Sequence, residues 1–333
     1  MSKVFNPKSP ITRLFNELDK VCPNIEYINF LIGRLSKEDI ESILYLSIFC
    51  FSSNKYGEIP SNMGDLSCLQ ALNIEISSLK EISEDIGNIT SLNVLNIEQN
   101  TKLTLLPNSI CNLENIHTLN LTCNSLRKLP SDIGYLTELK NLKVGTNKLT
   151  ELPDSITNLE KLIKLDISYN QVSQMPDNFG NLSKLKMLNL MKNELFKLPD
   201  DIGRLVSLKR LYCGSNNDIT ELPESMSCLV NLTYLDASDN NISRISENIG
   251  NLTNLHDFNI SCNELEELPE GISGLINLEL INVEDNRLET LPKGIGNLKS
   301  LTALNCCYNQ IRKLPDCVHN LPKLRFLQTS KQL

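Results

Sequence analysis

The chain has 333 residues, of which 41% are hydrophobic and 22% are charged, with no Trp and a formal net charge of −8. This composition provides for a sizeable core, and the acidic balance argues against a protein that mainly coats nucleic acid, because that task needs a basic face. The longest apolar run, residues 43–51, is about half the roughly 20 residues that a membrane helix needs, so we interpret it as a buried strand.

Residues 1–45 are predicted to form a helical N-terminal cap. A helix start at Ser9-Pro10 precedes apolar residues at helical spacing. Residues 24–31 could make a second short helix, and Ser36 with Asp39 three residues later marks the start of a third. The start of the chain also lacks the apolar segment of a secretory signal.

From Leu46 onward the pattern L-x-x-L-x-L-x-x-N-x-L-x-x-L-P-x-x-I-G-x-L-x-x returns every 23 or 24 residues, twelve times in full, and a truncated thirteenth copy begins at Leu324. Leu165 and Ile167 alternate with polar neighbours, which predicts a strand with one buried face. The recurring Asn, as in Asn170, can satisfy the backbone groups freed where each strand ends. In most copies a Pro follows the strand, and it prevents the second half of the repeat from pairing as a strand.

These features predict an α/β leucine-rich-repeat solenoid, a curved right-handed horseshoe that occupies residues 46–333. Its parallel β-sheet should line the concave face, with short 3-10 or extended segments on the convex face. No single repeat can bury its own apolar face, so both ends need covers. Only residues 324–333 remain at the C-terminal end, and an uncovered strand edge there could form a homodimer.

The eleven cysteines show no metal-ligand spacing, and an odd number cannot all pair within one chain. Cys213 and Cys306 occupy repeat positions that are otherwise mostly Leu, Ile or Val, so we expect them in the core. Free thiols favour a reducing, cytoplasmic compartment. Glycosylation triplets such as those at Asn88 and Asn251 are the main point against this interpretation.

Repeats such as residues 198–205, Leu-Pro-Asp-Asp-Ile-Gly-Arg-Leu, resemble the 23-residue class of intracellular Ras-pathway leucine-rich-repeat scaffolds. That class includes the Shoc2/Sur-8 type, the Ras suppressor proteins, the plant intracellular Ras-group repeats and the repeat domains of Scribble and Erbin. The resemblance covers residues 46–329 and implies a non-enzymatic adaptor that holds a small GTPase, a phosphatase or another signalling protein on its concave face. No PDZ domain follows the repeats, and Lys3-Val4-Phe5 lacks the spacer of the phosphatase-docking motif of Shoc2-type proteins.

Residues 23 apart are neighbours in the predicted sheet, so the exposed strand positions can be read as columns across it. Between residues 139 and 215 they are basic, with Tyr and Met interleaved and Asp166 as the one acidic interruption, and between 232 and 285 they are acidic. Tyr, Met and Arg are enriched in the cores of interfaces. The predicted partner-binding residues are Lys140, Lys143, Lys164, Tyr169, Lys186, Met187, Met191, Lys192, Lys209, Arg210, Tyr212, Tyr234, Asp236, Asp239, Asp257, Glu279, Glu284 and Asp285.

The sequence favours a cytoplasmic protein-binding scaffold or regulator of intracellular signalling. We expect no enzyme activity, metal or cofactor, because His117 and His256 lie six repeats apart and no other catalytic grouping is present. Three alternatives stay open. The chain could be a cell-surface or secreted adhesin or pattern receptor, the basic columns could bind RNA or an inositol phosphate, or the charges could simply be solvated.

Overall fold

The computed structural model describes residues 13, 30–50, 61–76, 79–216 and 218–329. The chain forms two compact units, Met1–Leu162 and Ile163–Leu333. The helix predicted after Ser9-Pro10 lies outside the described residues apart from residue 13, and so does most of the one predicted over residues 24–31. Asn54 and Ser77, which hold the repeat position of Asn170 in the first two copies, also lie outside them.

In the first unit residues 30–32 are helical, and helix α3 (Lys37–Ser42) follows them. The Ser36 Oγ accepts a hydrogen bond from the Asp39 N–H at 3.1 Å, and the Asp39 carboxylate accepts one from the Ser36 N–H at 3.2 Å. This reciprocal capping explains why the predicted third helix starts at that point. Parallel strands follow in chain order, each paired with the next, namely β1 (Tyr45–Cys50), β2 (Ala71–Ile76), β3 (Val94–Ile97), β4 (Thr118–Asn120) and β5 (Asn141–Lys143).

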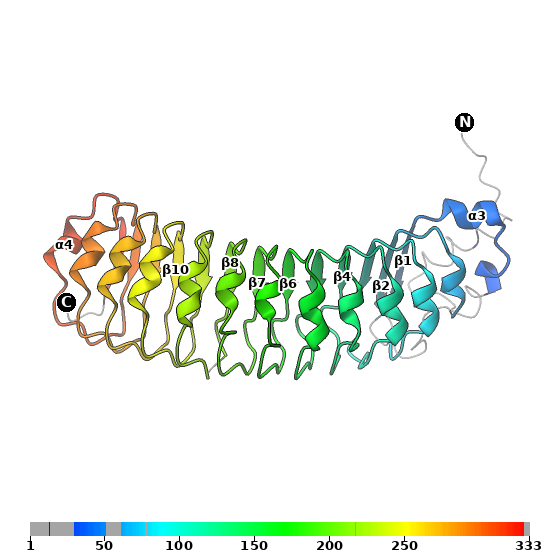
Figure 1. The fold of residues 1–333 in the computed structure, drawn as a ribbon, viewed down its shortest axis with the longest axis horizontal. Helices are drawn as coiled ribbons and strands as arrows, with labels where there is room; N and C mark the ends of the chain where they lie inside the picture. The colour runs from blue at the N-terminus through cyan, green and yellow to red at the C-terminus, as the bar shows by residue number, and fades with distance from the viewer. Residues whose placement is uncertain (1–12, 14–29, 51–60, 77–78, 217, 330–333) are drawn as a thin grey trace, which may run out of the picture. The chain divides into compact units, whose positions relative to one another are not determined.

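Short 3-10 helices alternate with these strands (Figure 1). They are η1 (Ser61–Asp65), η2 (Glu84–Asn88), η3 (Asn108–Asn112), η4 (Ile133–Tyr135) and η5 (Asp154–Asn158). The predicted strand over residues 43–51 is β1, although Leu44 and Tyr45 at its start are exposed.

The second unit repeats the same arrangement with eight parallel strands (Figure 1). They are β6 (Lys164–Asp166), β7 (Met187–Asn189), β8 (Arg210–Tyr212), β9 (Tyr234–Asp236), β10 (Asp257–Asn259), β11 (Leu280–Asn282), β12 (Ala303–Asn305) and β13 (Phe326–Gln328), and each pairs with the next. Between them lie η6 (Phe179–Asn181), η7 (Ile202–Arg204), η8 (Glu224–Cys228), η9 (Glu247–Asn251), η10 (Glu270–Gly274), η11 (Lys293–Asn297) and helix α4 (Asp316–His319).

In the described repeats the strands and the 3-10 segments bury their apolar side chains in the interior between them. Leu188 of β7 and Ile202 of η7 are fully buried. Pro199 holds the chain extended before the turn, and its carbonyl accepts a hydrogen bond from the Ile202 N–H at 3.1 Å. The prediction of parallel strands on one side and short 3-10 segments on the other is therefore confirmed.

A ladder of buried Asn side chains joins consecutive repeats. The amide of Asn263 donates to the carbonyl of Ile260 in its own repeat at 3.2 Å and to that of Ala237 in the preceding repeat at 3.0 Å. Its Oδ1 accepts from the Ile242 N–H at 2.9 Å. Asn147, Asn193, Asn216 and Asn286 make the same three kinds of contact. As predicted, the ladder satisfies backbone groups at the ends of the strands.

The residue before each ladder Asn that the structure describes has a left-handed backbone conformation, as at Tyr169 with φ of 55° and Asp285 with φ of 51°. This conformation disfavours residues other than Gly and Asn, so surrounding contacts must hold it. The bonds of the neighbouring Asn provide them. The chain therefore leaves the sheet at the same point in each repeat.

We predict that Asn263→Ala lowers the free energy of unfolding by about 2–4 kcal/mol, because several buried backbone groups lose their partner. A urea titration followed by circular dichroism measures the change. Asn181→Ala is the matched control, because Asn181 is exposed on the 3-10 side. Equal midpoints for the two variants would contradict the structural role of the ladder.

Candidate functional site

The candidate site is the sheet face of the second unit, which we define as the side of strands β6–β13 that points away from the core. The strand register places Arg210 of β8, Tyr234 of β9 and Asp257 of β10 side by side, and we call these three residues the central row. Neighbouring parallel strands lie about 4.8 Å apart. Tyr234 thus stands between a guanidinium and a carboxylate that are two strands apart.

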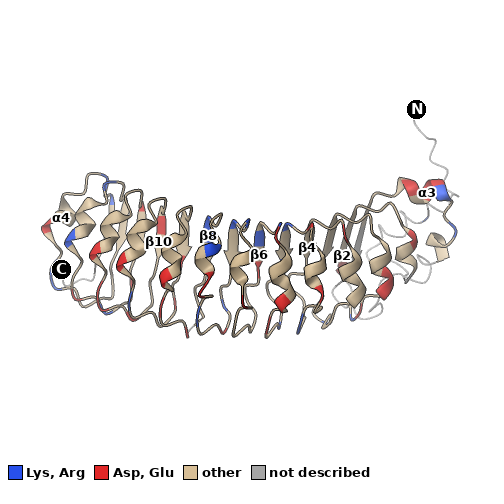
Figure 2. Cartoon of the chain, viewed as in Figure 1, with Lys and Arg blue, Asp and Glu red and all other residues tan. Residues whose placement is uncertain are grey.

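Four cations on this face form no ion pair with any described residue. They are Lys164, Lys186, Lys209 and Arg210, and all four are exposed. Figure 2 shows basic residues at β6 and β8 and acidic residues at β10. We call these four residues the basic group.

Ion pairs do form between repeats elsewhere in this unit. The Arg244 guanidinium lies 2.8 Å from the Glu221 carboxylate, and Arg287 lies 2.9 Å from Glu264. Both pairs join residues 23 apart that follow the strands. The repeat spacing therefore permits pairing across repeats, and the basic group does not use it.

Two acidic residues of the face are engaged locally. The Oδ1 of Asp166 accepts hydrogen bonds from the N–H and hydroxyl of Ser168, at 3.0 and 2.7 Å. Asp236 makes the same two bonds to Ser238, accepts a third from the Asn259 amide at 3.2 Å, and is only 7% exposed. The prediction of Asp236 as an exposed contact residue is wrong, because these bonds hold its carboxylate against the sheet.

Tyr212 and Tyr234 form a tilted pair on neighbouring strands, with ring centroids 4.8 Å apart. Their register is diagonal, since Tyr212 lies opposite Asp236 and Tyr234 lies opposite Arg210. Both side chains are half-buried. Burial raises the pKa of Tyr234, the carboxylates of Asp236 and Asp257 add to the increase, and Arg210 opposes it. The pair is a preformed aromatic platform between basic and acidic groups.

Four predicted residues lie in the left-handed turn that follows a strand. Tyr169, Lys192, Asp239 and Asp285 occupy the left-handed position where the chain leaves the sheet. Their side chains therefore border the face instead of lining its columns. The Lys192 Nζ stacks over the Tyr169 ring, 5.0 Å from its centroid, so this cation already has a partner.

The remaining predicted residues divide between the two units. In the second unit Met187, Met191 and Asp257 are half-buried and Glu279 is exposed. The half-buried Glu284 accepts a hydrogen bond from the Asn305 amide at 2.8 Å. The other two belong to the first unit, where Lys140 is half-buried before β5 and Lys143 is exposed at its end.

The sequence analysis missed an apolar row at the far end of this face. Leu280 of β11 pairs with Ala303 of β12, which pairs with Phe326 of β13. Leu280 is 40% and Phe326 is 68% exposed, and the three residues help to line a hollow of about 200 Å³. Extending the column of Arg210 and Tyr234 by four more repeats, through Asp257, would have found it.

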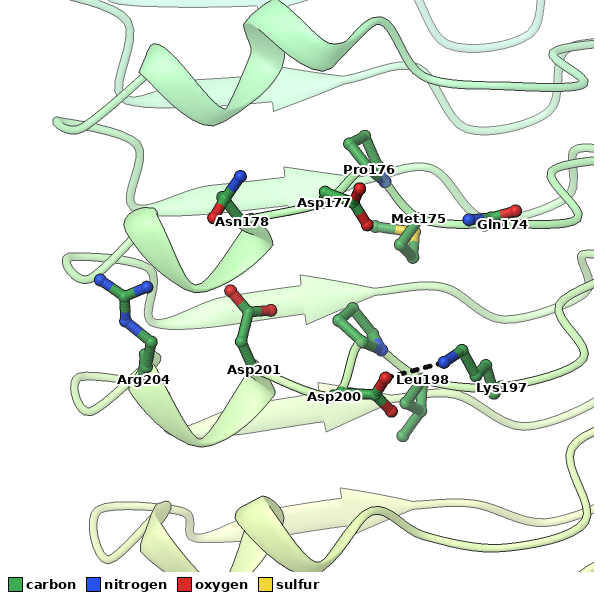
Figure 3. Close-up of a pocket in the computed structure, with 11 residues that line it drawn as sticks. Gln174, Met175, Pro176, Asp177, Asn178, Lys197, Leu198, Asp200, Asp201 and Arg204 are labelled. Carbon is green, nitrogen blue, oxygen red and sulfur yellow. Dashed lines mark hydrogen bonds and ion pairs between the residues drawn. The ribbon is translucent and has the colours of Figure 1, made fainter.

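A larger hollow, of about 400 Å³, lies on the Pro-containing segments between two repeats (Figure 3). Its walls include Asp177, Asp201 and Arg204, and the Lys197 Nζ pairs with the Asp200 carboxylate across 2.8 Å. The Asp201 carboxylate accepts a hydrogen bond from the Gly180 N–H at 2.9 Å. Equivalent hollows recur between other repeats, so the groove is a feature of the repeat.

No catalytic or metal-binding grouping accompanies these surfaces in the described part of the chain. Those residues contain no cluster of three or more His, Cys, Asp or Glu that could hold a metal ion. The Nδ1 atoms of His117 and His256 each lie 2.7 Å from a nearby backbone carbonyl oxygen, in different units. None of the described helices has the length and apolar character needed to cross a membrane.

Comparison with known proteins gives the family. The model of the leucine-rich repeat region matches residues 108–190 and 223–333, more than half of the chain. The chain belongs to the leucine-rich repeat region family. The predicted leucine-rich-repeat fold class is thereby confirmed. No curated protein matches the sequence significantly.

Solved leucine-rich repeat structures resemble the whole chain. A leucine-rich repeat protein of Leptospira interrogans is 28% identical with a TM-score of 0.70, covering 98% of this chain and 95% of its own. An internalin of Listeria monocytogenes, at 22% identity and a TM-score of 0.71, covers 96% and 97% and shows the fold alone. The plant peptide hormone receptor RGFR1, solved with RGF2, is 26% identical with a TM-score of 0.62, covering 88% of this chain and 56% of its own.

We predict that Tyr234 ionises above the ordinary tyrosine pKa of about 10. Because its folded pKa is raised, the protein loses stability as the pH rises from that value through the folded pKa. Asp257→Asn should lower the pKa of Tyr234, and Arg210→Gln should raise it further. Ultraviolet titration of phenolate absorbance, with Tyr234→Phe to assign the signal, measures both changes. An unchanged pKa of Tyr234 in both variants would contradict the side-by-side arrangement of the central row.

Proposed function

We propose that this leucine-rich repeat protein is a non-enzymatic scaffold or regulator of intracellular signalling that binds a protein partner on the sheet face of its second unit. The observation that supports it is the basic group, four exposed cations without an ion-pair partner among the described residues, beside the Tyr212–Tyr234 pair. Charges placed this way steer a partner and set its orientation. The aromatic pair supplies an anchor of the kind enriched in interface cores.

A purely solvated face explains this pattern less well. The acidic residues nearest the basic group, Asp166 and Asp236, are engaged by the serines two residues after them. The remaining carboxylates are concentrated on later strands, with Asp257 and Glu279 as examples. Interspersed positive and negative side chains would suffice for solubility. The separation of basic from acidic residues on this face favours a partner whose charges are arranged in the complementary order.

The proposed compartment is the cytoplasm. Cys213 and Cys306 are buried free thiols at apolar positions of the repeat, and Cys111 is a buried free thiol at the repeat's Gly position; a reducing environment preserves all three. The resemblance to Ras-pathway scaffolds suggests a small GTPase, a phosphatase or another signalling protein as the partner. The repeat motifs support that suggestion through residues 198–205 and their counterparts.

The alternative is a cell-surface or secreted receptor or adhesin. The likeness to a peptide hormone receptor and the exposed glycosylation triplets at Asn88 and Asn251 favour it. Intact-mass measurement with thiol counting on protein from its native source separates the two. Unmodified mass with all eleven thiols titratable supports the cytoplasmic proposal, whereas glycan on Asn88 or Asn251 or disulfides support the alternative.

We predict that combining Lys186→Glu, Lys209→Glu and Arg210→Glu reduces recovery of the specific partner by about tenfold or more, because three attractive contacts become repulsive. Quantitative mass spectrometry of an affinity pull-down from the native organism measures recovery. The matched control combines Lys148→Glu, Arg204→Glu and Arg312→Glu, three exposed cations away from the sheet face. Equal recovery by both variants, with unchanged melting temperatures, would refute the sheet-face site.

A further inference from the structure

We propose that the sheet face binds an extended peptide segment that crosses the strands, with an acidic, an aromatic or large apolar, and a basic side chain at alternate positions. This inference rests on the proposed function and adds the chemistry of the partner. It follows from the order of anchoring groups along the sheet.

The first anchor is the basic group. Lys186 directly precedes β7 and Lys209 directly precedes β8, whose first residue, Arg210, lies opposite Met187. The Lys186 carbonyl accepts hydrogen bonds from the N–H groups of Lys209 and Arg210, at 2.9 and 3.1 Å, so the three residues are neighbours. Three cations at the starts of two neighbouring strands, none in an ion pair with a described residue, form a site for a carboxylate. Arg210 can bind it with two parallel hydrogen bonds.

The second anchor is the Tyr212–Tyr234 pair on β8 and β9. The two rings pack against each other, with centroids 4.8 Å apart, and this contact orders both side chains. An incoming side chain therefore stacks on a surface that is already ordered. The third anchor is acidic. Asp257 follows Tyr234 in the central row on β10, and Glu279 is exposed beside β11.

The spacing of these anchors matches an extended chain. The basic anchor lies between β7 and β8, and the acidic anchor lies between β10 and β11. The distance between these two anchors is three strand intervals, or about 14 Å. Residues i and i+4 of an extended peptide lie about 13 Å apart, and residues i, i+2 and i+4 face the same side. The aromatic anchor lies one strand interval, about 5 Å, from the basic anchor and two intervals, about 10 Å, from the acidic one, whereas residue i+2 lies about 7 Å from residues i and i+4. The side chains on both partners span this difference of about 2–3 Å, so an acidic, an aromatic and a basic residue at these positions reach all three anchors together.

The apolar row provides a fourth anchor in the same direction. The hollow beside Leu280, Ala303 and Phe326 lies about one to two strand intervals beyond the acidic anchor, which corresponds to residue i+6. We assign an aliphatic side chain to that position. The hollow, with a volume of about 200 Å³, accepts one side chain. A bound helix, about 10 Å across, would instead need a long apolar groove, so the hollow favours an extended peptide.

The experiment selects phage-displayed random dodecapeptides on the full chain and counts motifs by deep sequencing. The expected result is enrichment of acidic-x-aromatic-x-basic peptides whose binding is lost on the variant with Lys186→Glu, Lys209→Glu and Arg210→Glu. The Lys148→Glu, Arg204→Glu, Arg312→Glu variant should retain them. Peptides that depend on the basic group but lack the motif would overturn the inference and leave the proposed function standing.

Charge exchange on one synthetic selected peptide tests the alignment, with fluorescence anisotropy as the measurement. The variant with Lys186→Glu, Lys209→Glu and Arg210→Glu should weaken binding about tenfold or more, and exchanging the peptide's acidic residue for Lys should restore it. Asp257→Lys should in the same way be rescued by a Glu at the peptide's basic position. Absence of both rescues overturns the inference. If no selected peptide and no native partner responds to the basic group, the proposed function fails as well.

Discussion

The buried Asn ladder is the interaction on which the rest of this structure depends. Each strand is short, three residues in β7 for example, and the backbone must turn out of the sheet through a left-handed residue. That turn would leave buried carbonyl and N–H groups without partners. Asn193 bonds both its own repeat and the preceding one, so the same side chain ends the strand and joins the repeats.

This constraint determines which positions are available for binding. The ladder and the alternating Leu residues occupy the inward positions, so only the outward columns can vary without disturbing the stack. Some outward residues are also used locally, as Asp166 and Asp236 are by their serines. What remains is a small set of unpaired cations, a tyrosine pair and separate carboxylates, from which we derive the proposed partner.

Much of the candidate site could be read from the sequence because a parallel stack turns a period of 23 into adjacency. Arg210 and Tyr234 lie opposite each other on neighbouring strands, as the columns predicted. The prediction that Asp236 is exposed was wrong because hydrogen bonds hold its carboxylate against the sheet. The position of a residue in a column does not reveal such bonds. Tyr169 and Lys192 were displaced by the left-handed turn, a backbone property that residue type poorly reveals at non-Gly positions.

The sequence alone determined the repeat, the strand and 3-10 alternation, the ladder and the sign of charge along the face, because each follows from local periodicity. Only the tertiary structure decided that Tyr212 and Tyr234 pack against each other and that the Lys192 ammonium stacks over the Tyr169 ring. It also decided that Leu280 and Phe326 border a hollow. These outcomes depend on side-chain directions and distances between repeats. A period specifies which residues are neighbours, whereas packing and desolvation decide which of them are left free to bind.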